Sequence, residues 1–132
     1  MKEVLDTRFF IAHLVEADPK LHERTRARLR DLRGRREGVV PTIVLAEFCD
    51  QACRHAGRRA ASQMHDAILA SGLNLQPLTI EIARASGMLR CRHREVPMAD
   101  CIVGATAAEL GGRVVSDDPH FGAMAGIRVT WL

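Results

Sequence analysis

Residues 111–120 have the sequence GGRVVSDDPH, which contains the signals of a strand with a helix on either side. The two glycines are typical of the end of a helix, and Pro119 is typical of the first position of the next one. The short β-branched run between them predicts a strand. A strand enclosed by two helices indicates an α/β fold with a parallel sheet.

The same alternation continues through the chain, without an internal repeat, a low-complexity tract or a linker. It predicts one domain over residues 1–132, with a sheet covered by helices. We expect strands near residues 2–5, 38–41, 73–76, 113–116 and 127–131. We expect helices near residues 8–16, 19–35, 42–56, 59–71, 79–92 and 98–110, and a helical turn at 119–124.

Four acidic positions lie in apolar segments, where carboxylates are uncommon. They are Asp6 after a strand, Glu47 within 39–48, Asp100 within 96–108, and the pair Asp117-Asp118 after another strand. A buried carboxylate without a partner costs several kcal/mol. A divalent cation is the simplest shared counter-charge, and oxygen ligands suit Mg²⁺ or Mn²⁺.

These acids are expected to meet at one edge of the sheet. Asp6 and the pair Asp117-Asp118 come at the carboxyl ends of two strands, which is the edge where ligands bind in parallel α/β sheets. Asp100 shares a helix face with apolar residues, and so does Glu47, so both side chains are expected to point inward. The pattern therefore predicts a metal-dependent active site at this edge.

Basic residues are concentrated in residues 20–36, which carry a net charge of +6, whereas the rest of the chain carries −3. A basic helix can be a solvated surface, but it is also the footprint expected for a polyanion partner. Aromatic residues make up only 4% of the chain, which disfavours base stacking. Since paired metal ions can activate water against a phosphodiester, the sequence predicts a metal-dependent nuclease.

Other classes of acid-based enzyme lack their required residues. Aspartyl-phosphate phosphatases and receiver domains need a lysine in the second half of the chain, whereas the only lysines are Lys2 and Lys20. The chain contains neither a P-loop nor a G-x-G-x-x-G motif. His120 follows Asp118-Pro119 and is expected to be a cap or surface residue rather than a general base.

The hydropathy pattern indicates a cytoplasmic protein. No apolar stretch is long enough to span a bilayer, and the amino-terminal residues lack the pattern of a signal peptide. The four cysteines are expected to be buried small apolar side chains, because a zinc site lacks a second ligand pair and disulfides are rare in a reducing compartment. They are Cys49, Cys53, Cys91 and Cys101.

An ordered set of motifs resembles that of PIN-domain ribonucleases, and specifically the toxins of VapBC toxin–antitoxin pairs. The motifs are Leu5-Asp6-Thr7, Ala46-Glu47, Pro97-Met98-Ala99-Asp100 and Ser116-Asp117-Asp118-Pro119-His120-Phe121. The resemblance covers essentially the full chain. It implies a three-layer α/β fold with a five-stranded, mostly parallel sheet. It also implies a Mg²⁺- or Mn²⁺-dependent endoribonuclease that forms a homodimer and is inhibited by a cognate antitoxin.

The resemblance also implies roles for individual residues. It assigns metal-binding carboxylates to Asp6, Glu47, Asp100 and Asp118, with Asp117 as an additional acid that could hold metal instead. Ser116 is expected to orient a carboxylate or a metal-bound water, and Thr7 to act in the same way beside Asp6. Arg8 stands where the family often has Asn, and it could contact the substrate phosphate or occupy part of the site.

Two alternatives have the same fold. One is an RNA-processing or repair nuclease without an antitoxin, and the other is a module that binds RNA or protein without cleaving. A small gene for a DNA-binding antitoxin immediately upstream would favour the toxin. The residues that could form a dimer face are Phe9, Phe10, Ile11 and Leu14.

Overall fold

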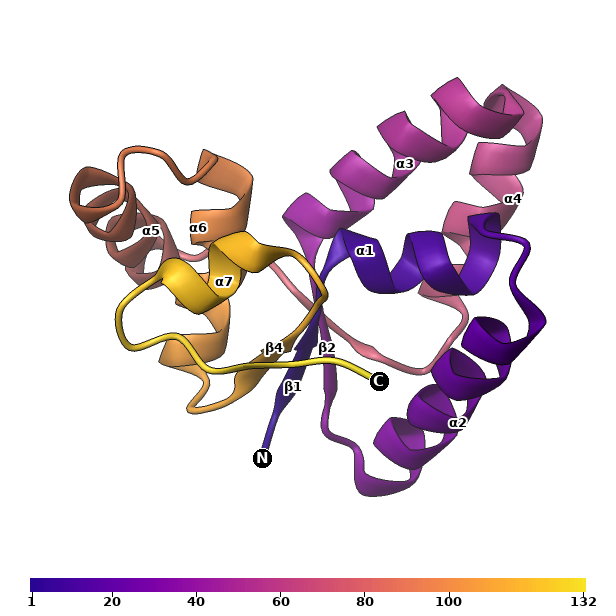
Figure 1. Ribbon diagram of the computed structural model, residues 1–132, viewed down its shortest axis with the longest axis horizontal. Coiled ribbons are helices and arrows are strands. Elements are labelled where there is room, and N and C mark those ends of the chain that lie inside the picture. The colour runs from indigo at the N-terminus through magenta and orange to yellow at the C-terminus, as the bar shows by residue number, and fades with distance from the viewer.

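The computed structural model describes residues 1–132 and consists of five short strands and the helices between them (Figure 1). The strands are β1 (Glu3–Leu5), β2 (Gly38–Pro41), β3 (Asn74–Gln76), β4 (Arg113–Val115) and β5 (Val129–Thr130). The α-helices are α1 (Thr7–Phe10), α2 (Pro19–Arg35), α3 (Thr42–Ala56), α4 (Arg58–Leu69), α5 (Ile80–Arg92), α6 (Met98–Glu109) and α7 (Pro119–Ala123), and a π-helical turn, η1 (Ile11–Val15), follows α1.

All strand pairs of the sheet are parallel, and the strand order is β3-β2-β1-β4-β5. The prediction of a mostly parallel five-stranded sheet is therefore confirmed. β2 and β3 are added on one side of β1, and β4 and β5 are added on its other side. The order thus reverses between β1 and β4, which is the point where open α/β sheets form a ligand-binding crevice.

The sheet is covered on both faces, which gives three layers. Figure 1 shows α5, α6 and α7 on one side of the strands and α1 to α4 on the other. A continuous core of buried apolar side chains, among them Val4, Val40, Phe48, Val103 and Val114, fills the space between the layers. None of the helices combines the length and apolar composition that crossing a bilayer requires.

The segment expected to form one helix over 8–16 is divided into α1 and η1, and its aromatic residues lie inside the protein. Phe9 and Phe10 are 0% and 1% exposed, and their rings pack edge to face with centroids 5.4 Å apart. Phe10 also packs against Phe48. The expectation that this pair forms a dimer face is wrong, because both rings are already buried in the core under α3.

A buried ion-pair network joins the opposite edge of the sheet to α2. Glu3 is 1% exposed, and its carboxylate accepts hydrogen bonds from Arg28 at 3.0 Å and from Arg113 at 2.9 Å. Arg28 also donates to the backbone carbonyl of Trp131 at 2.7 Å. Because no local pattern distinguishes Glu3 from an exposed strand residue, the sequence did not predict this network.

Replacing Glu3 with Gln is expected to lower the free energy of unfolding by roughly 2–4 kcal/mol, because it leaves two guanidinium groups without their buried counter-charge. Denaturant unfolding of the variant beside wild type measures this loss. Glu37→Gln is the matched control, since Glu37 makes an exposed ion pair with the amino terminus and its removal costs little. Equal stability of the two variants would contradict the prediction.

Candidate active site

The centre of the site is the side chain of Asp6, at the end of β1. Asp6 is 2% exposed, and its Oδ2 accepts a hydrogen bond of 2.8 Å from the hydroxyl of Ser116, which follows the adjacent β4. The same Ser116 oxygen accepts a hydrogen bond from the backbone N–H of Asp118 at 3.1 Å. Ser116 therefore fixes the orientation of Asp6 and also shapes the turn that positions Asp118.

Three further groups meet beside Asp6 where α6 and α7 begin. The potential metal-ligating atoms of Asp100, Asp118 and His120 all lie within 4.8 Å of one another. Nδ1 of His120 is 2.8 Å from Oδ1 of Asp118 and 3.2 Å from Oδ2 of Asp100. These contacts are charge pairs rather than aligned hydrogen bonds, because this buried nitrogen has no hydrogen-bond partner of good geometry.

Glu47 reaches the same edge from α3 and is held there by α1. Its Oε1 accepts a hydrogen bond of 2.9 Å from the hydroxyl of Thr7. Thr7 was expected to orient Asp6, but its side chain contacts Glu47 instead. The charge of Glu47 acts on both Asp6 and Asp100, so these three carboxylates share one electrostatic site.

Burial and mutual repulsion disfavour the charged forms of two of these acids. Burial raises the pKa of Asp6 to about 6, although its hydrogen bond from Ser116 opposes the increase. Burial, followed by the charges of Asp118, Asp6 and Glu47, raises the pKa of Asp100 to about 7. No lysine or arginine offsets this negative charge at Asp6 or Asp100.

This donor set fits a divalent cation, because the cation would supply the counter-charge that the carboxylates lack. Carboxylate oxygens suit Mg²⁺ or Mn²⁺. One feature differs from the all-oxygen site expected from the sequence. The imidazole of His120 borders the acids instead of acting only as a cap or surface group, because Asp118 accepts the backbone N–H of His120 at 2.9 Å and brings its ring close.

The structure separates the two consecutive acids, Asp117 and Asp118. The carboxylate of Asp117 is exposed and pairs with Arg8, with Nε to Oδ1 at 3.0 Å. Arg8 also contacts Glu16 at 3.2 Å. Arg8 is therefore engaged by Asp117 and Glu16 rather than by Asp6, and Asp118 is the member of the pair that lies beside Asp100.

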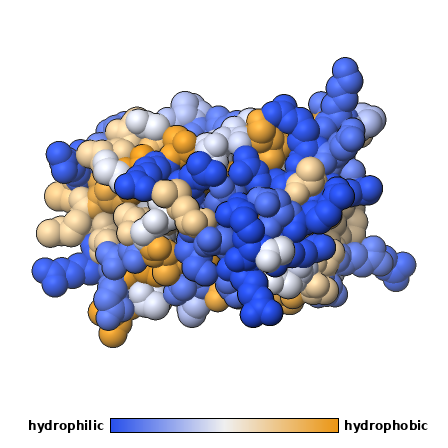
Figure 2. All heavy atoms as spheres, turned by 90° about the horizontal axis from the view of Figure 1, so that it is seen from below, coloured by the Kyte–Doolittle hydropathy of each residue, from blue (hydrophilic) through white to orange (hydrophobic).

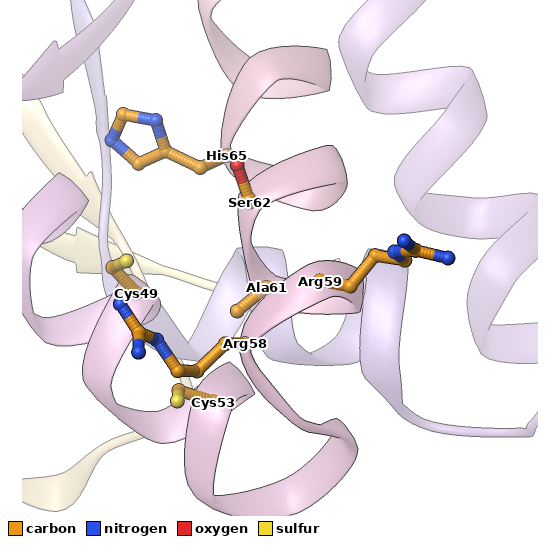
Figure 3. Close-up of a pocket in the computed structure, with 7 residues that line it drawn as sticks. All are labelled: Cys49, Cys53, Arg58, Arg59, Ala61, Ser62 and His65. Atoms are coloured by element: carbon orange, nitrogen blue, oxygen red, sulfur yellow. The ribbon is translucent and has the colours of Figure 1, made fainter.

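A hollow of about 430 Å³ lies between α3 and α4, and Figure 3 shows the side chains that line it. Arg58 extends toward the thiols of Cys49 and Cys53, whereas Arg59 points away from them. Cys49 and Cys91 are exposed and only Cys101 is fully buried, so the expectation of four buried cysteines is wrong. The only three-residue cluster with converging metal-ligating atoms is Asp100, Asp118 and His120.

Comparisons with known proteins agree with this fold. The sequence model of a family described as PIN domain matches residues 4–127. The structure of VapBC2 from Rickettsia felis bound to a promoter DNA fragment has a TM-score of 0.81 at 15% identity, and the match covers 100% of this chain and 99% of that one. DNA-bound VapBC from Salmonella typhimurium has a TM-score of 0.79 at 19% identity, covering 99% and 98%.

A third solved structure is that of VapC20 from Mycobacterium tuberculosis, which is described as a toxin that cleaves the sarcin–ricin loop. Its TM-score is 0.75 at 22% identity, and the match covers 96% of each chain. At these identities the similarity demonstrates a common fold. No curated protein sequence matches the chain significantly.

Proposed function

The chain belongs to the PIN-domain family, and from this premise we propose that it is a metal-dependent endoribonuclease and the toxin of a toxin–antitoxin pair. The observation that carries the proposal is the convergence of Asp6, Asp100 and Asp118, from three separate elements, with raised pKa values for Asp6 and Asp100. PIN domains and VapC toxins are nucleases, and this cluster is the place where such chemistry fits.

Asp6, Asp100, Asp118 and Glu47 would hold Mg²⁺ or Mn²⁺. When bound, the metal would lower the pKa of a water molecule and neutralise charge on the substrate phosphate. Ser116 holds the carboxylate of Asp6 in one orientation, and Thr7 does the same for Glu47. His120 stands between the carboxylates of Asp100 and Asp118, where its ring reduces their mutual repulsion when it is protonated.

RNA is the substrate we propose, and a cognate antitoxin is the protein partner. The description of VapC20 as a sarcin–ricin loop cleaving toxin and the presence of VapBC complexes among the similar structures support this assignment. We further propose a homodimer that acts in the cytoplasm. All four expected carboxylates are present, which favours a nuclease over a module that only binds.

Cleavage of a labelled total RNA pool by the purified protein tests the function. We expect cuts with Mg²⁺ or Mn²⁺ and none with EDTA. A gene for a small DNA-binding protein immediately upstream would distinguish the toxin from an RNA-processing nuclease without an antitoxin. Absence of cleavage with both metals would refute the nuclease proposal.

Replacing Ser116 with Ala is expected to weaken metal binding or activity by about 10–100-fold, because the carboxylate of Asp6 loses the hydrogen bond that orients it. The metal concentration that gives half-maximal cleavage measures this effect. Ser116→Thr is the control, since it retains a hydroxyl group at the same position. An unchanged metal requirement in Ser116→Ala would show that the hydroxyl does not position Asp6.

A further inference from the structure

The basic residues of α2 fall on two faces that make different contacts. On one face, Arg28 contacts Glu3 and the carbonyl of Trp131, Arg24 donates to the carbonyl of Leu132, and Arg35 pairs with Asp31. These contacts engage the arginines of this face, and those of Arg24 and Arg28 attach α2 to the rest of the fold. The arginines of this face therefore already have partners within the protein.

The other face lines a hollow of about 440 Å³ between α2 and η1. Arg26, Arg30 and Arg33 reach it at nearly one-turn intervals, and none of them makes an ion pair or a side-chain hydrogen bond, in contrast to the arginines of the first face. We call this hollow the basic pocket, and its lining residues are His13, His22, Arg26, Leu29, Arg30 and Arg33. In the view from below, hydrophilic residues cover most of the half of the molecule where α2 lies (Figure 2).

The charges that act on His13 indicate cationic surroundings beside α2. The rings of His13 and His22 stack with centroids 4.9 Å apart and an interplanar angle of 11°. Burial, followed by the positive charges of His22, Arg26 and Arg33, lowers the pKa of His13 to about 4. No acidic group is among the causes of this shift.

The chemistry of the lining selects a phosphate ligand. Guanidinium groups present planar pairs of N–H donors that match phosphate oxygens. Leu29 is the only apolar residue of the lining, so the basic pocket itself offers a ligand little apolar surface to bury. No aromatic residue other than the two histidines is present, so the pocket is suited to a nucleic-acid backbone rather than to bases.

The position of the basic pocket connects it to the acidic site. His13 lies six residues after Thr7 along the continuous helical segment formed by α1 and η1, which corresponds to about one and a half helical turns. Thr7 contacts Glu47 at the acidic edge. An RNA strand held at that edge therefore has a second cationic contact within a short distance of the cleavage centre.

We propose that the basic pocket binds phosphates of the RNA backbone outside the cleavage centre and so holds the substrate in place. This inference rests on the proposed function, because it names a second contact for the same RNA. The contact is independent of base sequence, and it draws its energy from counterion release as well as from the arginine hydrogen bonds.

The test compares two variants that each remove three positive charges from the α2 segment, in an Asp100→Asn background that prevents cleavage. The pocket variant combines Arg26→Gln, Arg30→Gln and Arg33→Gln, and the control combines Arg24→Gln, Arg35→Gln and Arg36→Gln. Binding of a labelled mixed-sequence single-stranded RNA is followed by fluorescence anisotropy at several salt concentrations. Single substitutions at Arg26 and Arg33 provide the same comparison if the triple variant is unstable.

We expect the pocket variant to bind RNA about 10-fold more weakly or worse, with the slope of log affinity against log salt reduced by about 2. The control is expected to change affinity by less than about 3-fold, because Arg24 and Arg35 have partners within the fold and none of its three arginines lines the basic pocket. Equal losses in both variants, or no loss in the pocket variant, would overturn the proposal. The proposal would also be overturned if the pocket substitutions weakened binding of labelled polyglutamate more than binding of RNA. That result would assign the basic pocket to an acidic protein segment.

Cleavage by the wild-type protein, measured in parallel with Mg²⁺, separates this inference from the proposed function. Cleavage together with unchanged RNA binding in the pocket variant would refute the pocket and leave the nuclease intact. A selective loss of RNA binding in the pocket variant, without any cleavage by the wild type, would support the basic pocket and refute the nuclease.

Discussion

Replacing Asp100 with Asn is expected to reduce RNA cleavage by roughly 10²–10³-fold or more, because it removes one of the charges that a metal ion needs at this site. The substitution retains the size of the side chain, so the packing of α6 against the sheet is preserved. The measurement is the initial rate of cleavage of labelled RNA with Mg²⁺ or Mn²⁺. Asp118→Asn is expected to produce a comparable loss.

Asp117→Asn is the matched control for Asp118→Asn, since the two residues are adjacent and the chemical change is the same. Asp117 is exposed and pairs with Arg8, outside the cluster formed by Asp100, Asp118 and His120. We therefore expect it to retain cleavage within a few-fold of wild type. Wild-type cleavage by the Asp100→Asn protein would refute the mechanism, and equal losses at positions 117 and 118 would refute the assignment of Asp118.

Divalent metal is expected to stabilise the wild-type protein strongly. At a concentration about 100 times its dissociation constant, the metal adds about 2.7 kcal/mol to the free energy of unfolding. For a chain of this length this corresponds to a rise in melting temperature of about 5–10 °C. Thermal unfolding with and without Mg²⁺ or Mn²⁺ measures the shift. The Asp100→Asn variant should lose most of it.

Without metal, Asp100→Asn is expected to raise the free energy of unfolding instead of lowering it. Burial, and to a lesser extent repulsion between the carboxylates, raises the pKa values of Asp6 and Asp100 to about 6 and about 7, from an ordinary value of 3.8. Between about pH 4 and pH 7 the folded protein therefore binds more protons than the unfolded chain. The contribution of these acids to stability is largest at low pH, and it falls as pH rises through this window.

Asp100→Asn should accordingly be more stable than wild type at pH 7.5 in EDTA, and the difference should shrink toward pH 4. Melting temperatures of both proteins across this pH range provide the measurement, and their difference isolates the contribution of Asp100 from that of other titrating groups. A variant that is less stable than wild type at pH 7.5 in EDTA would show that Asp100 has a counter-charge within the protein.

The arrangement of strands and helices and the edge that holds the acids were predictable from local sequence. In residues 111–120 a short β-branched run marks the strand, and glycine and proline mark where the flanking helices end and begin. Since the carboxyl ends of parallel strands lie at one edge, Asp6 and the pair Asp117-Asp118 could be placed at the same site without coordinates. The role of Ser116 was implied by the resemblance to PIN-domain ribonucleases. The structure confirms the five parallel strands and brings Ser116 within 2.8 Å of Asp6.

What only the tertiary structure decided are the contacts between side chains far apart in the chain. Arg8 and Asp117 are 109 residues apart, and so local sequence could not show that this pair leaves Asp118 beside Asp100. The burial of Glu3 against Arg113 and the division of α2 into a face with partners in the fold and the basic pocket depend on such contacts as well. Local sequence encodes backbone conformation, whereas the partner of a charged group depends on which elements pack together. The roles of Arg8, Asp117, Glu3 and the α2 arginines were therefore decided by tertiary packing.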